Sequence, residues 1–143
     1  MTRFYAIDGA NAAIPDVERI LVALRDQRED LITFRDRAIG LTPEDGEAPE
    51  EAAEELRRIR LRMQGLIDQM QAGVARLIEL EITLRDIKTG LIDFPALVSG
   101  RPIWLCWRLG EPEVQHWHAH DEGFASRRPL EELPTARGSG SLA

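Results

Sequence analysis

Apolar residues recur at helical spacing through the first third of the chain. From Asp16 onward they fall three or four residues apart, with Gln27 in the one polar slot, at Val17, Ile20, Leu24, Leu31, Phe34 and Ala38. This spacing predicts one apolar face on a helix whose other face is charged. Pro15, just ahead of the pattern, is expected to interrupt or restart the helix because proline lacks a backbone amide.

A second apolar stripe follows a loop that the Gly and Pro residues of 40–49 predict. It begins near Glu50 and runs at alternating spacings of three and four through Leu56, Ile59, Met63, Leu66, Met70, Gly73, Leu77 and Leu80. This heptad pattern is typical of coiled-coil-like packing. Gly73 on the stripe predicts either a close helix contact or a local kink. The short loop predicts an antiparallel helical hairpin over about 8–81.

The pattern changes to alternation after Glu81. ITLRDIKTGLIDF predicts a β-hairpin, PALVSGRP a loop, and PIWLCWR and EVQHWHA two further strands. Trp104, Cys106 and Arg108 would share one strand face, and His116 and His118 would share a face on the next strand. We therefore expect an α+β fold with a small antiparallel sheet of three or four strands in the C-terminal half, over about 82–130. A single domain would span 1–133, with a disordered tail over 134–143.

Charge and composition narrow the classes of partner. The net charge of −7 argues against nucleic-acid binding, which needs a basic face to neutralise phosphates. No apolar run reaches the length of a membrane span, and the N-terminus lacks the pattern of a signal peptide. Cys106 is the only cysteine, so no internal disulfide is expected. These features predict a cytoplasmic protein with no membrane or nucleic-acid partner.

The segment from Gly90 to Leu130 resembles the signature half of an uncharacterised bacterial family, domain of unknown function 2203. The resemblance rests on GLIDFPA, CWRLGEPE and WHAHDEGFASR, through Gly90, Leu91, Asp93, Phe94, Pro95, Ala96, Cys106 to Glu113, Trp117, His118, Asp121, Gly123, Phe124, Ala125 and Arg127. The N-terminal AIDGANAAIP is similar to the family's opening element. The resemblance implies no activity. His116 and His120 fall outside the family pattern.

A metal site is one interpretation of VQHWHAHDEG. Its candidate ligands are His116, His118, His120 and Asp121, with zinc as the ion that histidine favours. On an extended strand, His116 and His120 would lie about 13 Å apart at roughly 3.3 Å per residue. The three histidines therefore cannot close one site unless the chain bends after His118. The simpler interpretation has no cofactor, with His116 exposed and His118 hydrogen-bonded and partly buried.

A polar cluster beside the predicted strand ends is the second candidate site. Its proposed binding residues are Asp93, Arg108, Glu111, Glu113, His118, Asp121 and Arg127. Within it, His118, Asp121 and Asp93 are candidate catalytic residues, since an imidazole beside a carboxylate can act as an acid or base. The alternative is an ion-pair network that holds the sheet together. Cys106 is predicted to be an inert core residue rather than a nucleophile.

The functional hypothesis that follows is a non-enzymatic interaction or regulatory protein. A two-helix hairpin buries only one stripe per helix, so it needs the C-terminal region, a second copy of the chain, or both. A homodimer would give the outer residues Leu21, Ile32, Ile67 and Ile78 something to bury. The polar face of the sheet would recognise a protein partner or a small polar ligand. The alternative is a small hydrolase-like or metal-binding enzyme that uses His118 and neighbouring carboxylates.

Overall fold

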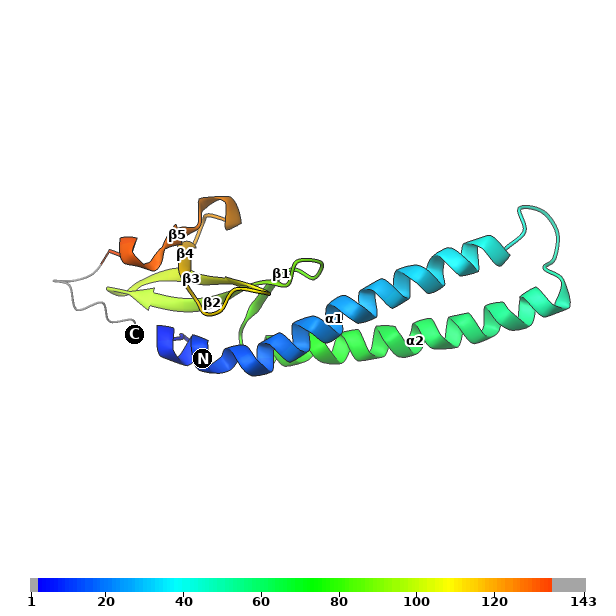
Figure 1. The fold of residues 1–143 in the computed structure, drawn as a ribbon, viewed down its shortest axis with the longest axis horizontal. Coiled ribbons are helices and arrows are strands. Elements are labelled where there is room, and N and C mark those ends of the chain that lie inside the picture. Colours follow the sequence, from blue (N-terminus) through cyan, green and yellow to red (C-terminus); the bar gives the residue numbers. More distant parts are fainter. Residues whose placement is uncertain (1–2, 135–143) are drawn as a thin grey trace.

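The computed structural model describes residues 3–134 and has an α+β fold (Figure 1). Two long helices precede a five-stranded antiparallel sheet in the C-terminal half, with strand order β1-β2-β3-β4-β5. The elements are α1 Ile7–Leu41, α2 Glu50–Glu79, β1 Thr83–Asp86, β2 Leu91–Val98, β3 Arg101–Arg108, β4 His116–Ala119 and β5 Arg128–Pro129, with short 3-10 helices η1 Phe124–Ser126 and η2 Leu130–Glu132.

The structure corrects the expected number of strands and does not test the predicted tail. The sheet has five strands where three or four were expected, because β5 is only two residues long and such a short strand leaves no alternating pattern. It pairs with β4 through Arg128 and Pro129. Except for Pro134, the disordered tail predicted over 134–143 lies outside the described residues.

Pro15 does not interrupt α1, which is continuous from Ile7 to Leu41. Pro15 cannot donate to the carbonyl of Asn11, and this loss weakens one turn. The turn is retained because Ala10 and Ile14 before it, and Val17 after it, are all buried in one core. Tertiary packing therefore overrides the helix-breaking tendency of this proline.

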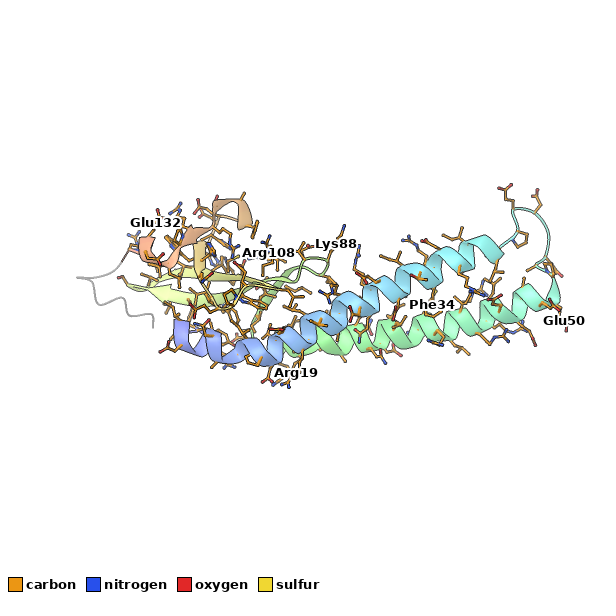
Figure 2. The ribbon with its side chains drawn as sticks, in the orientation of Figure 1. Arg19, Phe34, Glu50, Lys88, Arg108 and Glu132 are labelled. Carbon is orange, nitrogen blue, oxygen red and sulfur yellow. The ribbon has the colours of Figure 1, made fainter. Side chains whose placement is uncertain are left out.

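The helices form the predicted antiparallel hairpin, and Figure 1 shows it extending away from the sheet. Gly73 makes the close helix contact: a Cβ at this position would lie 3.2 Å from Cδ2 of Leu24. Farther along, Phe34 lies between the helices (Figure 2), with the Arg62 guanidinium 5.1 Å from its ring centre. Among the described residues, no helix is long and apolar enough to cross a membrane.

One face of the sheet packs on the first half of α1 and forms the core. Ile92, Phe94, Leu105 and Trp107 alternate onto this inner face and are fully buried. The Phe94 ring meets Tyr5 edge-on, with ring centres 5.0 Å apart. Leu21, expected on the outer side of the helical seam, is instead fully buried in this core. The sheet therefore supplies the partner that the first half of the hairpin needs.

The segment PALVSGRP, expected to be a loop, continues β2 and starts β3. Only Ser99 and Gly100 form the turn, and their φ angles of 52° and 78° match the two left-handed positions of a type I′ hairpin. β1 begins at Thr83, opposite Asp93, so β1 does not pair with β2 beyond that point. Pro95 fits there because an edge position needs no amide donor. The carbonyl of Pro95 accepts a 2.7 Å hydrogen bond from the amide of Tyr5.

Candidate functional site

The outer face of the sheet, opposite the helices, carries a buried polar cluster. Asp93 on β2 pairs with Cys106 on β3, so their side chains point to the same face. On β4, His116 pairs with Cys106, and His118 lies two residues farther along on that same face. Asp93, Cys106 and His118 are each about 1% exposed. Three adjacent strands thus place an acid, a thiol and an imidazole together.

Hydrogen bonds fix the acid and the imidazole. Nε2 of His118 lies 3.0 Å from Oδ2 of Asp93, and Nδ1 lies 3.0 Å from the carbonyl oxygen of Ala119. The same Oδ2 accepts a 2.8 Å bond from Nε of Arg85, which enters from β1. Oδ1 of Asp93 is buried and has no hydrogen-bond partner in the described part of the chain. One oxygen of the Asp93 carboxylate therefore has two hydrogen-bond partners, and the other has none among the described residues.

Cys106 has the properties of a protonated core thiol. Burial, and then the neighbouring Asp93 carboxylate, raise the pKa of Cys106 to about 12, because both disfavour a negative sulfur. In the absence of a bound cation, the side chain is a neutral thiol at physiological pH. This agrees with the prediction of an inert residue and not with that of a free nucleophile.

The segment after β4 covers the cluster and leaves a small cavity. The cavity measures about 170 Å³ and lies between Asp93, Cys106 and His118 on the sheet and Glu122, Gly123 and Phe124 in the covering segment. Glu122 is held in place: its Oε1 accepts from the amide of Ala119 at 3.3 Å and from Arg128 at 3.1 Å. A cavity of this size suits an ion or a ligand of a few atoms, since pockets for larger molecules measure about 300–1,000 Å³.

A second group of charges fastens the covering segment to β3. A guanidinium nitrogen of Arg127 lies 2.8 and 3.1 Å from the two carboxylate oxygens of Glu111, and both side chains are largely buried. Oε1 of Glu111 also accepts from the amide of Arg108 at 2.7 Å. The Arg127 guanidinium lies 4.7 Å from the ring centre of Phe124. This group holds Phe124 over the cavity and so has a positioning role.

The structure brings together only some of the candidate binding residues. Asp93 meets His118, Glu111 meets Arg127, and the backbone amide of Arg108 donates to Glu111 while the Arg108 side chain is exposed. Glu113 and Asp121 are exposed, and in residues 3–134 neither forms a side-chain hydrogen bond or ion pair. Of the candidate catalytic residues, Asp93 and His118 are therefore in contact, whereas Asp121 stays apart.

The candidate metal ligands predicted from the sequence, His116, His118, His120 and Asp121, do not surround one point. His120 does not join the cluster but stacks on Trp104, with ring centres 5.0 Å apart. His116 lies 3.4 Å from Glu111 instead. Within the described residues, the group with metal-ligand spacing is Asp93, Cys106 and His118. Sequence reasoning missed Arg85 altogether and did not join Cys106 to Asp93, although the Ser-Gly turn could have set that register.

Comparison with known proteins gives a family and no activity. A family model described as an uncharacterized conserved protein, DUF2203, matches residues 3–130. No curated protein and no solved structure matches the chain. The residues that carry the sequence resemblance include Asp93, Cys106, His118, Gly123 and Phe124, and all five border the cavity. Short motifs that lie far apart in the sequence thus converge on one place in the fold.

Proposed function

The chain belongs to the family of uncharacterised conserved proteins DUF2203, and for this member we propose a non-enzymatic interaction function. The protein would be a homodimer formed through its helical hairpin. Each copy would present the outer face of its sheet as a recognition surface for a protein or a small polar ligand. The observation that carries the proposal is an apolar groove along the hairpin.

The groove lies along the half of the hairpin nearer the sheet and is formed mainly by α2. It measures about 400 Å³ and is lined by Leu31 of α1 and by Ile67, Met70, Val74 and Ile78 of α2. Its lining is almost entirely apolar, and Ile78 is 66% exposed. Apolar side chains that gather in an open groove favour a protein contact, because single exposed apolar residues are common but clustered ones are not.

A second copy of the chain is the occupant that the groove fits best. In residues 63–75 of α2, Asp68 is the only charged residue, although charges crowd both ends of the helix. The centre of a protein interface is depleted of charge, and its rim is polar. The groove runs along the hairpin, so a two-fold axis across it would bring the same stretch of each copy together. Four helices would then enclose a core that two helices leave half open.

The outer face of the sheet supports recognition more than catalysis. Its buried carboxylates are paired with arginines, Asp93 with Arg85 and Glu111 with Arg127. Structural ion-pair networks have this character. At the rim, Arg108, Glu113 and Asp121 remain exposed and carry both signs of charge. A polar partner would contact these side chains.

The dimer is tested by the mass of the protein in solution as a function of concentration. The native chain is expected to show twice its monomer mass at tens of micromolar. Ile78→Glu adds a charge in the groove at an exposed position and is expected to give a folded monomer. Leu61→Glu adds the same charge at an exposed apolar position of α2, outside both the groove lining and residues 63–75, and should leave the dimer intact. A native monomer at this concentration would contradict the proposal.

A further inference from the structure

We propose that Asp93, Cys106 and His118 form a zinc site of three protein ligands whose fourth position opens into the cavity of the sheet's outer face. One ligand atom from each residue, a carboxylate oxygen, Sγ and a ring nitrogen, lies within 4.8 Å of the other two. Around tetrahedral zinc, such atoms lie about 3.3–3.6 Å apart, given bond lengths of about 2.0–2.3 Å. Small side-chain rotations would therefore close the site without moving a strand. The site is independent of the proposed dimer.

The hydrogen bonds of His118 point to a cation beside its ring. Both ring nitrogens face acceptor oxygens at 3.0 Å, those of Ala119 and Asp93. A neutral imidazole has only one N–H to donate. If Nδ1 donates to the Ala119 carbonyl, the lone pair of Nε2 faces a carboxylate unless a second proton or a metal ion lies between them. Ligating histidines commonly have this arrangement, with the other nitrogen donating to a backbone carbonyl.

Asp93 has one oxygen available as a ligand. Arg85 bonds to Oδ2, whereas Oδ1 has no hydrogen-bond partner in the described chain, although the Asp93 side chain is only 2% exposed. A buried carboxylate oxygen without a partner is rare in native proteins. With Oδ1 on the metal, Arg85 could remain on Oδ2 and orient the carboxylate. Its side chain is 42% exposed, so it can also turn outward.

Charge and ligand type favour zinc over a hard cation. An Asp carboxylate and a Cys thiolate together cancel the two charges of Zn²⁺, so the buried core of the site becomes neutral. Calcium and magnesium take oxygen ligands and bind sulfur poorly. A set of one oxygen, one nitrogen and one sulfur suits a borderline ion such as zinc. Zinc would bond to the sulfur in place of the thiol proton, which would pass to solvent.

This ligand set differs from the three-histidine site that the sequence alone invites. His116 lies beside Glu111, and His120 stacks on Trp104, so neither joins His118. The cavity of about 170 Å³ adjoins Asp93, Cys106 and His118 and leaves space for a water molecule or a small ligand atom on the metal. Three protein ligands with one open position are typical of zinc sites that bind or activate a small molecule.

The test uses the full chain after washing with a chelator. Added zinc is expected to bind at one ion per chain in equilibrium dialysis and to raise the melting temperature. Cobalt in place of zinc should give a sulfur-to-cobalt charge-transfer band in the near ultraviolet. The band needs no variant, because Cys106 is the only sulfur of its type in the chain. Absence of both stoichiometric uptake and the band would overturn the proposal.

Variants separate the two ligand sets. Cys106→Ala is expected to abolish the cobalt band and to lower zinc affinity at least a hundredfold. His120→Gln, which removes an exposed histidine of the same segment, should leave both unchanged. If His120→Gln abolished uptake, or if zinc bound equally well without Cys106, the site would not be the one proposed. Should Cys106→Ala fail to fold, the cobalt spectrum of the native chain still decides.

Discussion

The two faces of the sheet are built from the same strands and serve different purposes. On the inner face, Phe94, Leu105 and Trp107 are buried against α1, and the buried polar residues of the described chain, Asp93 and His118, both lie on the opposite face. On the outer face, one residue away along the same strands, Asp93 and Cys106 are buried under a short covering segment. The strand alternation alone separates an apolar core from a polar cluster.

Burial has opposite effects on the stability of the fold at the two faces of the sheet. On the inner face it removes apolar surface from water, which stabilises the fold. On the outer face it removes a carboxylate from water, which destabilises the fold unless each oxygen finds a partner. Asp93 has such partners at Oδ2 and none among the described residues at Oδ1. A buried carboxylate with one unpaired oxygen is therefore a candidate for function.

The largest effect is expected from truncation on the inner face. Phe94→Ala removes a fully buried ring that packs on Tyr5 and should lower the free energy of unfolding by about 4 kcal/mol. Urea denaturation followed by tryptophan fluorescence measures this change. A loss below about 1 kcal/mol would mean that the core of the sheet contributes little to stability.

A smaller effect is expected when the outer carboxylate is removed. In chelator-treated protein, Asp93→Ala leaves buried His118 without its acceptor and should cost about 3 kcal/mol. The loss stays below that of Phe94→Ala, because Arg85 can turn to solvent. Asp93→Asn retains one acceptor oxygen and should recover part of the loss. If Asp93→Ala were instead more stable than the native chain in chemical denaturation, the acid would have no structural role.

The smallest effect is expected at Cys106. Cys106→Ala removes one buried sulfur and should cost about 1 kcal/mol at pH 7 in metal-free protein. Burial raises the pKa of the thiol to about 12 from 9.0, so the folded state holds this proton more tightly than the unfolded state. The native chain should therefore lose its advantage over the variant as the pH rises from about 9 towards 12. Unfolding curves of both proteins at several pH values check this; a difference that stayed constant would contradict the raised pKa.

Much of the fold could be predicted because it follows from local periodicity. The heptad stripe around Met63 and Met70 predicted α2, and the alternation of Ile103, Leu105 and Trp107 predicted β3, since each pattern matches the geometry of one element. The continuation of β2 through Pro95 was missed. Proline in a strand is permitted only at an edge, and whether β2 has an unpaired edge at Pro95 depends on where β1 begins.

The candidate site was only half predictable because it depends on register between strands. His118 and Asp121 are close in sequence, and this suggested a pair, but the turn after β4 separates them. The true neighbour of His118 is Asp93, 25 residues away. Ser99 and Gly100 could have supplied half of this information, since a two-residue turn fixes the pairing of β2 with β3, although not that of β3 with β4. Counted back from that turn, Asp93 lies opposite Cys106.

The neighbour-to-neighbour strand order has a consequence for how the chain folds. Each strand pairs with the one before it, so the loops that bring Asp93, Cys106 and His118 together are short. Docking of α1 is different: the bond from the Val114 amide to the Asn11 side chain spans 103 residues. Short loops close with a smaller entropy loss than long ones. The cavity beside Asp93, Cys106 and His118 can therefore form from the consecutively paired strands alone. The inner face of the sheet is covered only when α1, from the start of the chain, packs on it.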